Sequence, residues 1–406
     1  MKGGEGVARR AADASVTRPL IGAMGLVAVA ALPAFLTASL APEIGHEFAF
    51  GAAALGISIG SFFAVSSVAS SPAGRLVTRT DATASIRLTV ALTVICSLGV
   101  AGLVESTPAL IVGLVIGGLA NAVSGPAASA LLTRDLHPGR QGVGYGALTA
   151  GAPAASLLAG LALPLVAEPL GWRMAFVLVA GLALVIGMVA GLRKRGAHGR
   201  VAIVPAARTA ASAGPARWSA VHMYAVSAAL ASAGITGMMA FLVVYAIESG
   251  LTAAEAGLLL AVAGLAAGGC RIAFGAAADR IRERADTHVV VLFVLSSIGF
   301  LLLIGGTPAT IIPGALIAGG LGWGASGLLN LAAVRVGTHT PSEAVGIAFT
   351  GIFVGALIGP VVTGLIAAGI GYGPAWALGA LLQLAAAATA RLAMAMTSGS
   401  GRRDLI

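Results

Sequence analysis

Residues 253–284 read AAEAGLLLAVAGLAAGGCRIAFGAAADRIRER, and this stretch decides the fold class. Within it, residues 254–276 are apolar or small apart from Glu255 near the start and Arg271 near the end. A helix of that length reaches roughly 35 Å, which is enough to cross a hydrocarbon core of about 30 Å. A charged segment, 279–284, ends the run. The stretch therefore predicts a membrane-spanning helix followed by a basic loop.

The same pattern recurs along the whole chain. The 406 residues are 58% hydrophobic and 10% charged, whereas about a quarter of the residues of a soluble domain are charged. Lipid offers no partners for backbone polar groups, and the runs lack the alternation of barrel strands, so the spans must be helices. We predict an all-α membrane protein with twelve spans, near 19–41, 50–70, 86–104, 108–132, 146–167, 174–192, 219–246, 254–276, 288–305, 309–333, 344–368 and 374–396.

The positive charges predict how the chain is oriented. With both ends inside, every Lys and Arg except Arg173 and Arg271 falls in the tails, the inner loops or the inner ends of spans. The positive-inside rule then predicts a multi-pass protein of the cytoplasmic (inner) membrane with both termini cytoplasmic. The net charge of +9 is explained by this topology. We expect no nucleic-acid binding, because no inner loop combines aromatic residues with a foldable domain.

A long polar interruption, rich in Ala, Arg, Gly and Pro, separates six spans from the other six. It predicts a linker between two bundles. The expected organisation is a cytoplasmic tail at 1–18, a six-helix bundle at 19–195, a cytoplasmic linker at 196–217, a second six-helix bundle at 218–396 and a cytoplasmic tail at 397–406.

The two halves also share an internal repeat. A few short elements of the first half recur 200 to 202 positions later, and six spans per half give both copies one orientation, as in a parallel repeat. The matched elements are Gly117-Gly118-Leu119, Ser124-Gly125 and Arg134 with Gly319-Gly320-Leu321, Ser326-Gly327 and Arg335, Gly171-Trp172 with Gly371-Tyr372, and Gly74 with Gly275.

The segment from Gly275 to Arg284, a Gly followed four residues later by Asp279-Arg280 and further basic residues, resembles the inner-loop motif of the major facilitator superfamily. The resemblance covers essentially the whole chain and implies two six-helix bundles around a cavity that opens alternately to each side. The Gly would let two helices touch, and the Asp could cap a helix and pair with Arg. The resemblance thus implies a cytoplasmic gate made by Gly275, Asp279, Arg280 and Arg284, with Gly74 and Arg79 in the first-half copy.

The sequence also departs from that family's patterns. In the first-half copy Thr78 stands where the family has Asp, so Arg75 and Arg79 could simply be topology charges. The proton-coupled exporters of the family often carry an Arg in span four, where this chain has Gly113, and a Gly-Pro motif in span five, where it has Gly151-Ala152-Pro153. In span eleven, Gly355-x-x-x-Gly359-Pro360 is interpreted as close helix packing with a proline bend.

Arg271 is the ionisable residue that lies deep within a predicted span, and no Asp or Glu lies at a comparable depth. It could snorkel to the headgroups, but its helical face is small, which favours a cavity over lipid. A substrate anion would then supply the missing charge. Monocarboxylate carriers of the superfamily place an Arg similarly, although Ala267 stands where they have an Asp. The small face consists of Gly264, Ala267, Gly268 and Gly275, and the expected lipid flank of Leu258, Leu265 and Ile272.

Other polar residues at mid-span depth are further candidates for substrate binding. They are Asn121, Trp323 and Ser326, with Asn330 about one turn nearer the cytoplasm. Amides within spans often join helices instead, which is the alternative for Asn121 and Asn330.

These observations predict a secondary active transporter of a small organic anion, similar to a monocarboxylate. The alternatives are a drug or multidrug efflux transporter and a non-transporting receptor or scaffold. No enzyme activity, cofactor or metal is expected, because the six His are never paired at i, i+4 and Cys96 and Cys270 fit buried positions in separate spans. The expected partners are the substrate, the bilayer and a coupling proton carried on the substrate or on a group still to be identified, and we expect a monomer.

Overall fold

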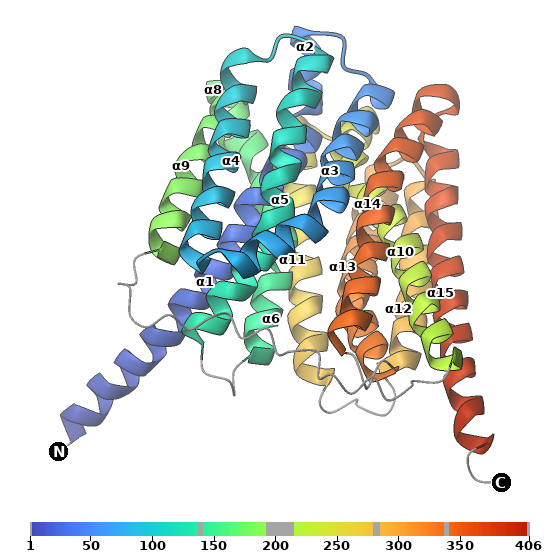
Figure 1. Ribbon diagram of the computed structural model, residues 1–406. Coiled ribbons are helices and arrows are strands. Elements are labelled where there is room, and N and C mark those ends of the chain that lie inside the picture. Colours follow the sequence, from blue (N-terminus) through green and yellow to red (C-terminus); the bar gives the residue numbers. More distant parts are fainter. Residues whose placement is uncertain (1, 137–140, 192–214, 279–284, 337–340, 404–406) are drawn as a thin grey trace.

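The computed structural model describes residues 2–136, 141–191, 215–278, 285–336 and 341–403. Over these ranges the chain is helical and contains no strand, which confirms the predicted all-α class (Figure 1).

The first half begins with a long helix and a short one and then crosses back and forth. Its helices are α1 (Lys2–Ser39), α2 (Ala41–Glu47), α3 (Ala52–Arg79), α4 (Ala82–Leu103), α5 (Thr107–Asp135), α6 (Gln141–Thr149), α7 (Gly151–Ala162), a π-helical turn (Leu163–Ala167), α8 (Glu168–Leu170) and α9 (Trp172–Gly191). Span five, predicted as one run at 146–167, is thus interrupted at Ala150, close to Pro153, which has no N–H to continue the ladder.

The second half consists of six long helices. They are α10 (Pro215–Glu248), α11 (Ala253–Ala278), α12 (Ala285–Leu303), α13 (Pro308–Val336), α14 (Pro341–Ile370) and α15 (Tyr372–Arg403).

These helices agree with the twelve predicted spans. Among the described residues, eleven helical segments are long and apolar enough to cross a membrane, and α12 supplies a shorter apolar stretch, Thr287–Leu303. The ninth span was predicted to reach residue 305, but the helix ends two residues earlier, where Gly306 adopts a positive φ of 66°.

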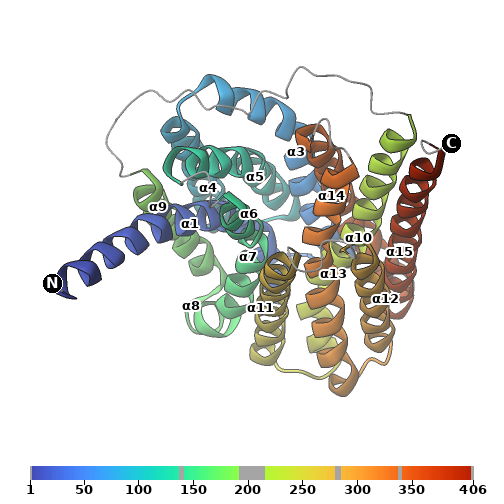
Figure 2. The same cartoon turned by 90° about the horizontal axis from the view of Figure 1, so that it is seen from below.

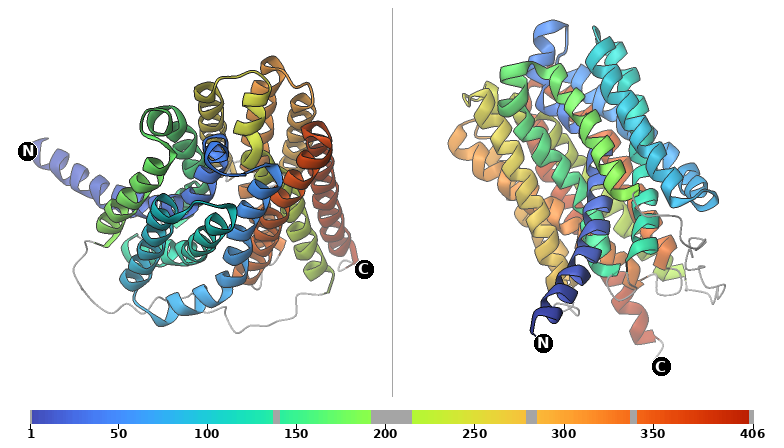
Figure 3. Two further views of the ribbon diagram at one scale, coloured as in Figure 1. Left: turned by 90° about the horizontal axis from the view of Figure 1, so that it is seen from above. Right: turned by 90° about the vertical axis from the view of Figure 1, so that its left-hand side faces the viewer.

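The helices form two side-by-side groups. Both chain termini lie at one end, which we call the terminal face, and α2 lies at the other end, the opposite face (Figures 1 and 3). Viewed along the helices, α1–α9 and α10–α15 occupy separate sides, and they meet where α3 lies beside α14 and α7 beside α11 (Figure 2).

Two equivalent turns show the internal repeat in the backbone. Gly171 precedes span six with a φ of 84°, and Gly371 precedes span twelve with a φ of 87°. This left-handed region is open to glycine at little cost. The sequence match of Gly171-Trp172 with Gly371-Tyr372 is therefore also a match of conformation.

Glycines bring helices into backbone contact at the seams between the halves. A Cβ added at Gly160 of α7 would lie 2.5 Å from the backbone of α11, at Gly257 and Ala261. One added at Gly364 of α14 would lie 2.6 Å from the Ala52 carbonyl oxygen of α3. All of these residues lie towards the opposite face, so the halves are in close contact there.

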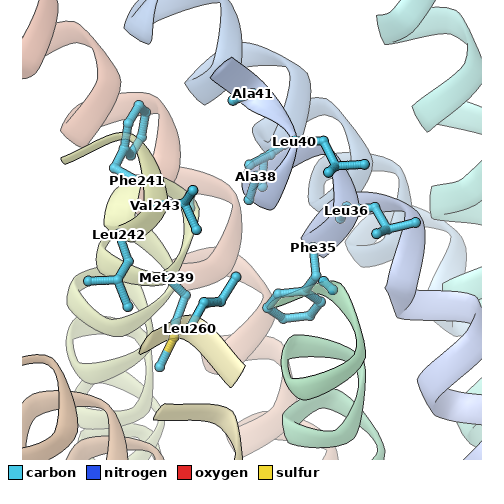
Figure 4. Close-up of a cluster of buried hydrophobic side chains, with 14 of the residues drawn as sticks. Phe35, Leu36, Ala38, Leu40, Ala41, Met239, Phe241, Leu242, Val243 and Leu260 are labelled. Atoms are coloured by element: carbon cyan, nitrogen blue, oxygen red, sulfur yellow. The ribbon is translucent and has the colours of Figure 1, made fainter. Parts of the chain in front are cut away.

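The buried apolar clusters are distributed in the same way. One cluster joins both halves and contains Phe35, Leu36 and Leu40 of α1 together with Met239 and Phe241 of α10 (Figure 4). Two further clusters, towards the terminal face, each draw their residues from a single half. The described residues therefore form a molecule whose halves are sealed together at the opposite face and have separate cores towards the terminal face.

Candidate substrate site

Arg271 of α11 lies at the seam between the halves, where its guanidinium donates three hydrogen bonds. Nε donates to the Trp323 carbonyl oxygen at 3.1 Å and Nη2 to Ser326 Oγ at 2.8 Å, both on α13. Nη1 donates across the seam to the Thr149 carbonyl oxygen of α6 at 2.5 Å. The structure thus brings together three of the residues predicted from the sequence: Arg271, Trp323 and Ser326.

The bonds to α13 depend on a close approach of two helices. A Cβ added at Gly324 would lie 2.7 Å from Cys270 Cβ, so glycine is needed for α11 to pack this tightly. Ser326 is oriented by its own bond, because Oγ donates to the Trp323 carbonyl oxygen at 2.7 Å and so presents its lone pairs to Arg271. The second-half residues therefore hold the guanidinium in a fixed plane.

The charge of Arg271 has no acidic partner in the described region. The ion pairs among described residues are Arg134 with Asp135 and Arg173 with Glu47, both in the first half. The neighbours of Arg271 are a hydroxyl and two carbonyl oxygens, which carry no formal charge. Because a guanidinium has five N–H donors and three are used, two remain available for a further acceptor.

One aromatic ring borders the guanidinium, and a second packs against the first. Arg271 Cζ lies 5.5 Å from the centre of the Trp323 ring, within cation–π range. Trp323 in turn faces Phe35 of α1 with a centroid distance of 5.9 Å. The site therefore combines one cation with an apolar aromatic wall contributed by both halves.

The small-residue face of α11 differs from the expectation. It was expected to line a cavity, but a Cβ at Gly264 would lie 2.8 Å from Leu157 N and 2.9 Å from the Pro153 carbonyl oxygen. These small residues serve a tight contact with α7. The expected lipid flank is supported, since Leu258 and Leu265 are exposed on the helix surface. Ile272 and Gly275 also lie in α11, but the surroundings of these two residues are outside what the structure describes.

One of the two predicted asparagines bonds to another helix of the first half, and the side chain of the other is outside the described residues. Asn121 Nδ2 donates to Ser66 Oγ at 3.1 Å and so joins α5 to α3. This contact matches the helix-joining alternative raised for an amide within a span. Asn330 belongs to α13, and its side chain is outside the described residues.

The predicted gate is only partly covered by the structure. Asp279, Arg280 and Arg284 lie outside the described residues. Arg79 is exposed in the last turn of α3. A Cβ added at Gly74 would meet nothing within 4 Å, so no helix packs against Gly74 in this conformation among the described residues.

Two members of the site were missed by the sequence analysis. Thr149 contributes a backbone carbonyl, and no side-chain pattern reports a carbonyl. The available signal was Pro153, four residues later, because proline leaves the carbonyl at that spacing without its helical donor. Phe35 could not be distinguished from the other apolar residues of span one.

Comparison with known proteins agrees with this architecture. A model of the Major Facilitator Superfamily matches residues 23–348. A solved structure with a similar fold is that of a bacterial homolog to the human lysosomal transporter Spinster, in an inward-facing and unoccupied conformation. The two chains are 16% identical, the alignment covers 94% of this chain and 95% of the other, and the TM-score is 0.65. At that identity the likeness describes the fold alone.

Proposed function

Because the chain belongs to the Major Facilitator Superfamily, a family of membrane transporters, we propose that it carries a small organic anion by alternating access. The observation that carries the proposal is the guanidinium of Arg271. It lies between the halves and has no carboxylate partner among the described residues.

The charge balance favours an anion. An ionised group away from water is costly unless an opposite charge or a set of hydrogen bonds compensates it. Three neutral acceptors compensate Arg271 in part. A substrate carboxylate would add the missing charge and could accept from Nη1 and Nη2 in the paired geometry that guanidinium favours, in place of their neutral acceptors.

The aromatic wall suggests what the rest of the substrate is like. Trp323 lies beside the guanidinium and Phe35 packs against Trp323, so a short apolar group attached to the carboxylate could pack against this aromatic pair. A small monocarboxylate fits this combination.

The same aromatic pair is the feature that favours a second candidate, efflux of an apolar or cationic drug. A cation would be repelled by Arg271, and the described residues offer no acid at this site to offset that repulsion. We therefore rank drug efflux second.

The first prediction tests Arg271 directly. A thermal-shift screen of purified protein against carboxylates, sugars, amino acids and drugs identifies ligands, because binding to the folded state raises the unfolding midpoint. Uptake or counterflow of the ligand is then compared between wild type, Arg271→Lys and Arg271→Gln at matched membrane expression. We expect at least a tenfold loss for Lys, because it keeps the charge but loses the planar fork.

The matched control is Arg391→Lys, the same substitution at an exposed position of α15, which should transport normally. Normal transport by Arg271→Lys, or a screen that yields only cations and neutral drugs, would overturn the anion proposal in favour of drug efflux.

A further inference from the structure

The hydrogen bond from Arg271 to Thr149 connects the two halves on the side where their cores are separate. Among side-chain hydrogen bonds between described residues, it is the one that joins α1–α9 to α10–α15. Both partners lie beyond the apolar cluster that seals the opposite face, since that cluster ends at Ala263 on α11.

The Thr149 carbonyl is available for this bond because of the local sequence. In a continuous α-helix it would accept from the N–H of the residue four positions later. That residue is Pro153, which has no N–H. The helix breaks at Ala150 instead, and the carbonyl that the proline leaves free accepts Nη1 of Arg271.

The proposed function connects this bond with substrate binding. The guanidinium that reaches Thr149 is the same group proposed to hold the substrate anion. A carboxylate is a stronger acceptor for guanidinium than a neutral carbonyl. An anion that draws the Nη atoms into a paired geometry would therefore compete with Thr149 for Nη1.

We propose that the Arg271–Thr149 hydrogen bond is a latch between the halves on the terminal-face side, held by the carbonyl that Pro153 leaves free and released when an anion takes over the guanidinium. This inference rests on the proposed function for its trigger, but the latch itself does not depend on which solute is carried. It assigns Pro153 as a positioning residue for the latch.

The second prediction tests the latch without any ligand. Spin labels at Leu76→Cys on α3 and Thr287→Cys on α12, both exposed near the terminal face, report the separation of the halves when Cys96 and Cys270 are replaced by Ala. Pro153→Ala restores an N–H that competes for the Thr149 carbonyl, and Arg271→Gln removes the donor. Both should shift the distance distribution to longer values.

Pro126→Ala is the matched control. Pro126 also lies inside a helix of the first half, but no described side chain donates to the carbonyl oxygen four residues before it, which the proline leaves free. It should leave the distribution unchanged. If neither Pro153→Ala nor Arg271→Gln lengthens the distance, the latch is wrong, whatever the transport assay shows.

Addition of pyruvate tests the release step. The labelled wild type should shift towards the distribution of ligand-free Pro153→Ala, and Pro153→Ala should bind pyruvate with a lower half-saturating concentration, because no latch bond has to break first. Pyruvate uptake that depends on Arg271 without any distance change would overturn anion release. If the variants lengthen the distance but the protein neither binds nor transports any anion, the proposed function is wrong and the latch is still supported.

Discussion

At the scale of single residues, the charged side chains of Glu47 and Arg173 are stabilised by groups within hydrogen-bond distance of them. At the opposite face, Glu47 of α2 accepts from Trp172 Nε1 at 2.9 Å and pairs with Arg173. Arg173 also donates to the Val104 carbonyl oxygen at 2.8 Å, so one ion pair ties together α2, α9 and the end of α4. Trp172 was noted only as part of the internal repeat, and its bond to Glu47 gives it a structural role as well.

The third prediction concerns this ion pair. The hydrogen bond from Arg173 lowers the pKa of the Glu47 carboxyl, and the bond from Trp172 acts in the same direction. A carboxyl whose pKa is depressed by folding adds stability above its unfolded pKa of about 4.3, and that stability is lost as the pH falls through the folded pKa. Glu47→Gln should therefore lower the unfolding midpoint slightly at pH 7, since an exposed pair contributes about 0–1 kcal/mol.

The difference between wild type and Glu47→Gln should shrink as the pH is lowered from 5 towards 3. The control is Glu43→Gln on the same helix, whose carboxylate forms no ion pair with a described residue. A difference between wild type and Glu47→Gln that does not depend on pH would contradict the assignment. Differential scanning fluorimetry of the purified protein over this pH range measures it.

At the scale of helices, small residues decide which elements can touch. Gly355 and Gly359 of α14 let its backbone approach the Ala229 and Ala233 carbonyl oxygens of α10, where a Cβ would clash. This confirms the close packing predicted from the Gly355-x-x-x-Gly359 pattern.

The fourth prediction is that Gly359→Ala lowers the free energy of unfolding by about 1–3 kcal/mol, the usual effect of overpacking a tight contact. Gly369→Ala on the same helix should be neutral or stabilising, because its Cβ would enter open space and alanine favours a helix by up to ~1 kcal/mol over glycine. Unfolding of purified variants measures both, and equal effects at the two positions would refute the packing argument.

At the scale of the whole molecule, the sequence predicted more of the fold than of the site. Each membrane span is a continuous run of apolar residues, and the internal repeat is visible as matching residues in the sequence. The helices and the division into two halves could therefore be predicted from the sequence alone. Contacts between spans depend on which helices become neighbours. This is why the small face of α11 was assigned to a cavity when it packs on α7, and why the Thr149 partner of Arg271 could not be foreseen.

The fifth prediction concerns orientation. From the one-sided Lys and Arg distribution we predict that the terminal face lies in the cytoplasm. In a background without Cys96 and Cys270, Asp81→Cys lies near the terminal face and Glu105→Cys near the opposite face, and each removes one exposed carboxylate. An impermeant maleimide should label Glu105→Cys in intact cells and should label Asp81→Cys only after the cells are broken. Labelling of Asp81→Cys from outside would reverse the topology.

The apolar cluster that closes the opposite face also has a thermal consequence. If transport requires that face to open, residues such as Phe35, Leu36 and Phe241 must part and meet water. Exposure of apolar surface carries a positive heat-capacity change, and the penalty for exposing it weakens on cooling. The equilibrium between the closed and open arrangements should therefore be curved in temperature, and cold should favour the open one. An Arrhenius plot of a transport rate limited by that opening would bend rather than follow a single straight line.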